Sequence, residues 1–148
     1  MINKVIFRAK LKSTSLAGSW VYWNVYGELC TENGKRHPLK LEMPHSVHLY
    51  YNIIQIQDKI DSKTIGMYSG LSDKDGVKIY DGDICLFEND DDEISFYAIK
   101  YEVRKGCFIT LERHVEYPTF PDHLDDFFAE RCKVVCDIFN PEYSGVSI

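Results

Sequence analysis

The sequence lacks several features that would place the protein at a membrane or on a nucleic acid. Its longest strongly apolar run is far shorter than the roughly 20 residues that span a bilayer, so we expect no membrane segment. It also lacks an excess of basic residues. The formal net charge of −6 would repel a phosphate backbone, whose binding depends on Lys and Arg side chains, so nucleic-acid binding is disfavoured.

Cysteines are few and irregularly placed. There are five, an odd number at uneven spacings, and no basic and apolar signal segment opens the sequence. Thiols in this pattern are typical of a reducing compartment. We therefore expect no disulfides and a cytoplasmic protein.

Aromatic residues, in contrast, are abundant. The chain has ten Tyr, eight Phe and two Trp among 148 residues, of which 45% are hydrophobic. Aromatic and β-branched side chains favour pleated, half-buried surfaces, and a chain of this length can bury a core without disulfides. The composition predicts a mainly β protein.

The first part of the chain is predicted to form a β subdomain. Apolar and polar residues alternate over residues 2–11 and 20–29, as in half-buried strands. Asn33-Gly34 suits a tight hairpin turn in which both central residues have positive φ. Another extended segment is expected at 46–56, and the polar residues 57–63 are interpreted as a connector.

The connector divides the chain into an N-terminal β subdomain, residues 1–63, and a second subdomain, residues 64–148, which together form one compact unit. Strands separated by short turns in the second predict a small meandering barrel. They are expected at 84–88, 94–104, 107–112 and 134–139. One helix is expected at 121–130, with Pro121 in its first turn, acids at Asp122, Asp125 and Asp126, and an apolar stripe of Leu124, Phe127 and Phe128.

The densest turn chemistry lies between residues 64 and 84. Asp75-Gly76 and Asp81-Gly82 each place a Gly, which tolerates positive φ, beside an Asp that can bond nearby backbone. We predict that Gly76 and Gly82 are turn residues. We also predict that Asp81 and Asp83 bond backbone amides of the turn rather than forming a pair for acid–base catalysis. The structural turn motif comprises Gly70, Asp73, Asp75, Gly76, Tyr80, Asp81, Gly82 and Asp83.

These turns belong to a longer pattern, Tyr68-Ser-Gly-Leu-Ser-Asp-Lys-Asp-Gly-Val-Lys-Ile-Tyr-Asp-Gly-Asp-Ile84. It resembles the signature of the YopX family, small proteins encoded by phages and prophages. Three further segments are similar to elements that flank this signature, namely residues 7–10, 18–22 and 137–142. Ser69, Asp75 and Cys136 depart from the family pattern without removing a turn or a core position. The resemblance implies a β-rich fold whose second half is similar to an SH3-type barrel, and it implies no established enzymatic activity, so no catalytic residues carry over.

No set of residues has the spacing of a known active site. The acidic run 90–93 lacks the spaced ligands and central Gly of a calcium loop, and we interpret it as a solvated hairpin tip. Gly66-Met-Tyr-Ser69-Gly70 misses the register of a nucleophile elbow by one residue. Six Cys and His side chains are of the types that bind zinc, but their spacing does not support a zinc site: Cys132, Cys136, His45, His48, His114 and His123. We predict no catalytic, metal-binding or cofactor-binding residues.

The aromatic segment that begins at Trp20 has two faces. In a small β protein one face must be buried, so its rings divide between the core and a surface that could stack on a base or a partner. The sequence leaves both uses open. The candidate interface comprises Trp20, Tyr22, Trp23 and Tyr26.

We therefore expect a phage or prophage accessory protein that acts as a non-catalytic binding or self-assembling module in the cytoplasm of a bacterial host cell, with no cofactor and an unidentified protein partner. Because the N-terminal subdomain has no helix to cover its aromatic surface, we expect a homo-oligomer that associates through it. Two alternatives stay open. A nucleic-acid-binding barrel requires a basic stripe on the folded surface, and a metal-dependent hydrolase requires carboxylates or His and Cys side chains that converge in one pocket.

Overall fold

The computed structural model describes residues 5–12, 16–43, 46–113 and 122–140. Within these ranges the chain is mainly β, its strands pair only in antiparallel fashion, and its one α-helix is short. Contacts divide the chain into two compact units, Met1–Met67 and Tyr68–Ile148, called unit 1 and unit 2 below. The predicted mainly β fold with one short helix is confirmed, and the likeness to an SH3-type barrel stays a prediction.

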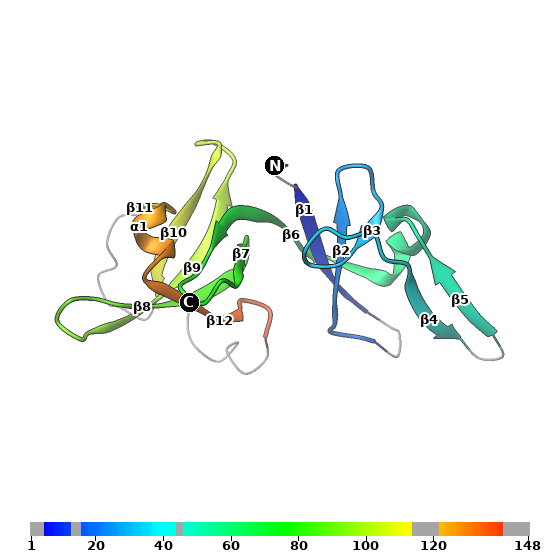
Figure 1. Cartoon of the computed structure of the whole chain (residues 1–148), viewed down its shortest axis with the longest axis horizontal. Helices are drawn as coiled ribbons and strands as arrows, with labels where there is room; N and C mark the ends of the chain where they lie inside the picture. The colour runs from blue at the N-terminus through cyan, green and yellow to red at the C-terminus, as the bar shows by residue number, and fades with distance from the viewer. Residues whose placement is uncertain (1–4, 13–15, 44–45, 114–121, 141–148) are drawn as a thin grey trace. The chain divides into compact units, whose positions relative to one another are not determined.

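The main sheet of unit 1 has the strand order β3-β2-β1-β6 (Figure 1). Its strands are β1 (Ile6–Leu11), β2 (Trp20–Asn24), β3 (Leu29–Cys30) and β6 (Ile60–Ser72). A separate hairpin consists of β4 (Leu39–Met43) and β5 (Ser46–Tyr50). The last residues of β6 belong to unit 2 and pair there with β7 (Lys78–Tyr80), so the division between the units lies within a strand.

The core of unit 1 gathers side chains from the sheet, the hairpin and a 3-10 helix, η1 (Ile53–Lys59). Ala9 and Val21 face each other across β1 and β2, and both are at most 5% exposed. The buried cluster comprises Ala9, Leu11, Val21, Leu29, Leu41, Ile56 and Ile60. Apolar burial therefore holds the hairpin and η1 against the sheet.

The strand expected at residues 20–29 is wrong beyond Asn24. The Asn24 Oδ1 atom accepts hydrogen bonds from the amides of Tyr26, at 2.9 Å, and Glu28, at 3.0 Å. Gly27 then has a φ of +80° and donates its amide to the Asn24 carbonyl. An Asn side chain that bonds its own backbone favours a turn over a strand, so Tyr26 lies in a tight turn between β2 and β3.

The extended segment expected at 46–56 is also too long. The strand β5 ends at Tyr50, and Asn52 caps η1 by accepting the Ile54 amide at 2.9 Å. The Gln55 side chain accepts the Asn52 amide in return, at 2.9 Å. This reciprocal capping box satisfies amides that would otherwise lack partners, and so it favours a helical turn. The segment interpreted as a connector, 57–63, contains the end of η1 and the beginning of β6.

The turn predicted at Asn33-Gly34 is present but has a different geometry. The Gly34 amide bonds the Thr31 carbonyl at 2.8 Å, and the Thr31 amide bonds the Lys35 carbonyl at 2.7 Å. Gly34 has a φ of +82°, whereas Asn33 is not in the positive-φ region. The expected turn with two positive φ values is therefore wrong, and of these two residues only Gly34 has a positive φ.

Unit 2 is built on a five-stranded sheet with the order β11-β10-β9-β8-β12 (Figure 1). Its strands are β8 (Asp83–Glu88), β9 (Ile94–Glu102), β10 (Cys107–Arg113), β11 (Asp122–His123) and β12 (Cys132–Asp137). Four of these follow one another in space as they do in sequence, and β12 returns to the free side of β8. The predicted meander is thus present, with strand ends that differ by one to two residues from those expected.

The helix expected at 121–130 is much shorter, because α1 spans only Asp126–Ala129. Asp122 lies in β11, opposite Thr110 of β10. The first part of the expected helix is therefore a short strand that pairs with the sheet. Asp125 is the N-cap and accepts the Phe128 amide at 2.9 Å. The apolar stripe also divides, since Phe128 is buried and Phe127 is 60% exposed. Pro121 lies outside the described residues.

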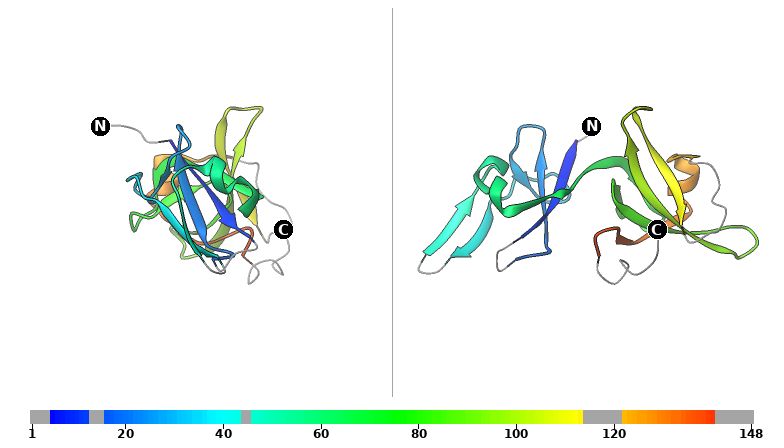
Figure 2. Two further views of the ribbon diagram at one scale, coloured as in Figure 1. Left: turned by 90° about the vertical axis from the view of Figure 1, so that its right-hand side faces the viewer. Right: turned by 180° about the vertical axis from the view of Figure 1, so that it is seen from behind.

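The core of unit 2 lies between α1 and the sheet. Figure 2, seen from behind, shows the short helix beside β10. The buried cluster comprises Ile79, Cys85, Ile99, Phe128, Ala129 and Cys132. The helix therefore packs on this sheet. None of the helices in the described part of the chain has the length and apolar character needed to cross a membrane.

Gly82 offers a test of the turn that leads into β8. Gly76 and Gly82 have φ values of +83° and +94°, which confirms the predicted backbone. A Cβ at Gly82 would meet the Phe139 ring at 3.2 Å, whereas one at Gly76 would meet nothing within 4 Å. We expect Gly76→Ala to lower the free energy of unfolding by about 1 kcal/mol through backbone strain alone, and Gly82→Ala by about 2 kcal/mol. Urea unfolding measures both, and a loss at Gly82 no larger than at Gly76 would contradict the role of the Phe139 contact.

Candidate functional site

The signature residues form a hydrogen-bonded turn centred on Asp73. This carboxylate is 6% exposed, and its Oδ1 atom accepts the amides of Asp75, at 2.8 Å, and Val77, at 2.9 Å. Its Oδ2 atom accepts the Val134 amide of β12 at 2.9 Å. Because both oxygens are engaged by backbone amides, Asp73 joins the turn to the sheet and has a structural role.

Asp83 and Asp81 also bond backbone amides. The Asp83 Oδ2 atom accepts the Tyr80 amide at 2.7 Å within the turn, as predicted. The Asp81 Oδ1 atom instead accepts the amide of Tyr101 in β9, at 3.0 Å, so its partner lies in another strand and not in the turn. Tyr80 is fully buried and packs against the ring of Tyr68 at 5.5 Å. Gly70, with a φ of +89°, lies where the pairing of β6 with β7 shifts register.

The aromatic residues proposed as an interface are separated by the structure. Trp23 packs against the core of unit 1 and stacks on Phe7 at 5.9 Å. Trp20 and Tyr22 lie on the opposite face of the strand by alternation. The Arg8 guanidinium lies over the Trp20 ring at 3.8 Å, so this ring already has a cationic partner. The group of four is thus not one surface.

Tyr26 belongs to a different exposed surface, which we call the turn patch. It comprises Val25, Tyr26, Tyr51 and Ile54, with exposed fractions of 59%, 81%, 58% and 74%. The Ile53 amide bonds the Gly27 carbonyl at 2.8 Å, and this bond places the turn after β2 beside the beginning of η1. Sequence reasoning missed Tyr51 and Ile54, because the sequence pattern predicts one extended strand for the segment that contains them.

The Cys and His residues of the possible zinc set do not gather in the described part of the chain. No three His, Cys, Asp or Glu side chains there are close enough to hold a metal ion, and His45 and His114 lie outside it. Cys132 instead sits in the core of unit 2 beside Cys85. A hydrogen bond between these two thiols and the burial of Cys85 raise the pKa of Cys85 well above its usual value. Such thiols are inert neutral core groups.

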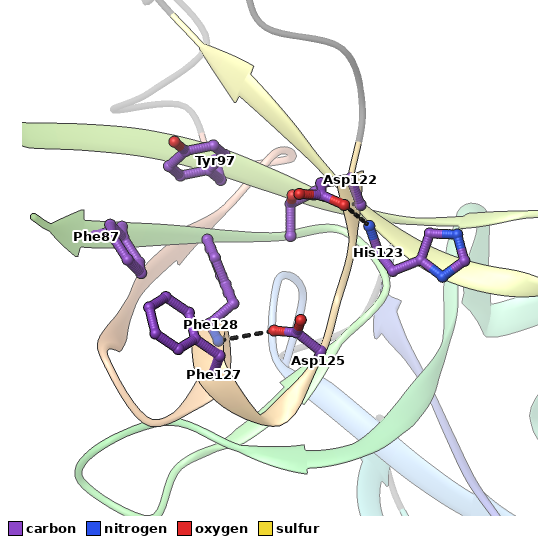
Figure 3. Close-up of a pocket in the computed structure, with 8 residues that line it drawn as sticks. Phe87, Tyr97, Asp122, His123, Asp125, Phe127 and Phe128 are labelled. Atoms are coloured by element: carbon purple, nitrogen blue, oxygen red, sulfur yellow. Dashed lines mark hydrogen bonds between the residues drawn. The ribbon is translucent and has the colours of Figure 1, made fainter.

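One pocket in unit 2 combines aromatic and acidic side chains, and sequence reasoning did not identify it. This aromatic pocket has a volume of about 320 Å³. Its lining comprises Phe87, Tyr97, Thr110, Asp122, His123, Asp125, Phe127 and Phe128. Figure 3 shows Phe87, Tyr97 and the two neighbouring Phe side chains on one side, with the two Asp side chains on the other.

The aromatic side is a cluster of rings in mutual contact. Phe87 from β8 stacks on Phe128 from α1, with centroids 5.2 Å apart. Tyr97 from β9 meets the same Phe128 ring edge to face at 5.1 Å. Phe87 and Tyr97 point to the same face of the sheet. Tyr97 pairs with Cys85 of β8, and Phe87 lies two residues after Cys85, on the same face of that strand. Three elements are therefore needed to form this wall.

Tyr97 carries the one polar group of that wall. Its hydroxyl donates to the Glu112 Oε2 atom at 3.5 Å. Burial first, and then the nearby Glu112 charge, raise the pKa of Tyr97 above its usual value, so the side chain is a neutral phenol at physiological pH.

The acidic side is formed by the segment that enters α1. The Asp122 Oδ1 atom accepts the His123 amide at 2.9 Å, and the Asp125 Oδ1 atom accepts the Phe128 amide at 2.9 Å (Figure 3). Each carboxylate thus uses one oxygen for the local backbone. Among the described residues, none donates a hydrogen bond to the second oxygen of either. The imidazole of His123 points away from the aromatic rings (Figure 3).

The described lining of this pocket combines aromatic rings with carboxylates. It contains no Ser, Cys or Lys nucleophile among its described lining residues. Among the described residues, no carboxylate accepts a hydrogen bond from the His123 imidazole, as one does in a catalytic triad. Rings and carboxylates together instead suit a ligand that has apolar surface and positive charge.

A second hollow, in unit 1, has a volume of about 390 Å³. Its lining comprises Glu28, Leu29, Arg36, His37, Pro38, Tyr51 and Asn52. Glu28 and Arg36 form an ion pair across it at 2.7 Å, so its opposite charges neutralise each other. A ligand in this hollow would meet a smaller net charge than in the aromatic pocket, whose described lining has two Asp and no Lys or Arg.

The family model described as YopX protein matches residues 10–143, which is most of the chain. No curated protein matches the sequence.

Asp73 provides a direct test of the signature turn. We expect Asp73→Ala to lower the free energy of unfolding by roughly 3 kcal/mol, because three amides lose their acceptor. The neighbouring Asp75→Ala removes an exposed carboxylate and serves as the matched control, with an expected loss under about 0.5 kcal/mol. Urea unfolding of both variants decides the matter, and equal losses would show that the buried carboxylate has no special role.

Proposed function

We propose that this protein, which belongs to the YopX family, is a non-catalytic binding module encoded by a phage or prophage and active in the cytoplasm of the bacterial host. Family membership supports the phage origin, since the family consists of small phage and prophage proteins. The acidic net charge supports a protein partner over a nucleic acid. The observation that carries the binding role is the aromatic pocket of unit 2.

The proposed ligand is an extended segment of a partner protein. The pocket volume of about 320 Å³ is at the lower end of the range for ligand sites, which suits one or two side chains more than a large cofactor. Phe127, one of the lining residues, is 60% exposed, and an aromatic side chain that becomes buried when a partner binds can contribute strongly to the binding energy. We therefore expect binding energy to concentrate on a few anchor residues of the partner.

The absence of a catalytic role is also a proposal, and it rests on how the carboxylates are used. Asp73 and Asp83 are buried and bonded to backbone amides. Asp122 and Asp125 do converge on one pocket, which is the feature that a metal-dependent hydrolase would require. However, they do not form a three-ligand group with His123. A peptide-binding role uses these residues without a metal.

Peptide selection tests this proposal. Peptides selected from a random display library against the full chain are expected to bind in the pocket. Their dissociation constants, measured by fluorescence anisotropy, should rise at least about tenfold in Phe127→Ala, because the variant removes the exposed ring of the pocket.

Ile94→Ala is the matched control. Ile94 is 57% exposed and lies on the opposite face of β9 from Tyr97, since the two are an odd number of residues apart. Its peptide affinities should equal those of the unmodified protein. A selection that yields no binding peptide, or peptides that Phe127→Ala does not weaken, would refute the proposed function.

Self-association is a second candidate role, and the turn patch favours it. Four apolar side chains there are more than half exposed, which is typical of an interface core. We propose that unit 1 joins a second copy of the chain through this patch, so that the protein is a homo-oligomer. Trp23, part of the interface expected from the sequence, is better explained as a core residue.

Light scattering after gel filtration measures this association. We expect the protein at micromolar concentration to have more than the monomer mass, and the double variant Tyr26→Ser, Ile54→Ser to dissociate at a concentration at least about tenfold higher. Leu16→Ser is the control, because Leu16 lies in the loop at the other end of β2. A strictly monomeric protein would refute the association, and an oligomer that both variants leave intact would refute its placement.

A further inference from the structure

Building on the proposed peptide-binding function, we infer that the aromatic pocket binds the guanidinium group of an arginine side chain on the partner protein. Its rings and its carboxylates lie on opposite sides of one small space (Figure 3). A guanidinium group has apolar faces and hydrogen-bond donors along its edge, so it can satisfy both sides at once.

The aromatic side supplies faces for the plane of the group. Tyr97 and Phe87 are half-buried, so part of each ring borders the pocket. The quadrupole of an aromatic ring attracts a cation over its face, and arginine is found in such contacts more often than lysine. Tyr97 is neutral and its hydroxyl is turned to Glu112, so the three rings in mutual contact, Phe87, Tyr97 and Phe128, carry no charge that repels a cation.

The acidic side supplies acceptors for the edge of the group. Asp122 and Asp125 each have one oxygen bonded to a backbone amide and a second oxygen that the described residues do not engage. A guanidinium presents five N–H donors in a fixed plane and can donate to both carboxylates. The described lining contains no Lys or Arg that would neutralise them.

The chain already contains the same pairing of guanidinium and ring at two places. Arg8 lies over Trp20 at 3.8 Å. Arg131 lies over Phe127 at 3.7 Å, where its Nη1 atom donates to the Phe127 carbonyl at 2.9 Å. Arg131 therefore covers part of one pocket ring, and a bound arginine would use the remaining rings.

Lysine fits this site less well. Its ammonium is a compact and strongly hydrated charge, so it loses more solvation when it is placed among rings and cannot bridge two separated carboxylates with a plane of donors. The site thus predicts a preference for arginine over lysine and over the neutral isostere citrulline.

A titration followed by NMR tests the inference directly on the full chain. The probes are N-acetyl-L-arginine methylamide and the corresponding citrulline and lysine derivatives. We expect the arginine probe to give saturable shifts at the backbone amides of residues 122–128, with a dissociation constant at least about tenfold lower than that of the citrulline probe. Absence of saturable shifts, or equal affinities for the arginine and lysine probes, would overturn the guanidinium assignment.

Matched variants locate the effect. In the double variant Asp122→Asn, Asp125→Asn the backbone hydrogen bonds can persist, because Asn also accepts amides and caps helices, while both charges are lost. We expect its arginine affinity to fall at least about tenfold. Asp126→Asn removes one charge from the first turn of α1 outside the lining and should change the affinity less than twofold. Equal effects of the two variants would show that only the net charge matters and would refute the site.

The outcome separates this inference from the proposed function. Selected peptides that lack arginine but are weakened by Phe127→Ala would refute the guanidinium assignment and leave the peptide-binding role in place. Failure to obtain any peptide that depends on Phe127 would refute the peptide-binding role itself.

Discussion

The carboxylate of Asp73 accepts hydrogen bonds from two amides of its own turn and from the Val134 amide of β12. Next to it, the Lys74 amide bonds the Cys132 carbonyl at 3.1 Å, so the turn holds β12 at two points. The helix α1 precedes β12 directly and contributes Phe128 to the core and to the pocket. The position of the pocket therefore depends on a buried acid that lies in the signature turn and does not itself line it.

The parts of this fold that could be predicted are those specified locally. The turns at Gly76 and Gly82 follow from Asp-Gly pairs, and the meander of β8, β9 and β10 follows from alternation and short connections. The ends of elements were less predictable, because single side chains decide them. Asn24 ends β2 and Asn52 begins η1. Each side chain accepts a backbone amide that would bond a neighbouring strand if the strand continued.

The pocket could not be read from the sequence, since its walls come from β8, β9, β10 and the segment around α1. Phe127 and Phe128 are adjacent and chemically identical, yet one is exposed and the other is buried. Helical periodicity predicted one stripe for both. That pattern failed because Asp122 and His123 pair with β10, which leaves a single helical turn after Asp125. Pairing between distant segments thus overrides local propensity here.

The acids of unit 2 show why counting carboxylates does not identify a binding site. Asp73 engages both oxygens with backbone amides, so its charge is fully used in holding the fold. Asp122 and Asp125 each accept a backbone amide with one oxygen, and this hydrogen bond orients the carboxylate. The second oxygen of each stays available as an acceptor beside a pocket that aromatic rings also line. A carboxylate held in place by one oxygen and open at the other costs little further ordering when a ligand binds. This division of hydrogen bonds, more than the number of charges, distinguishes the acids proposed to bind a ligand from the structural ones.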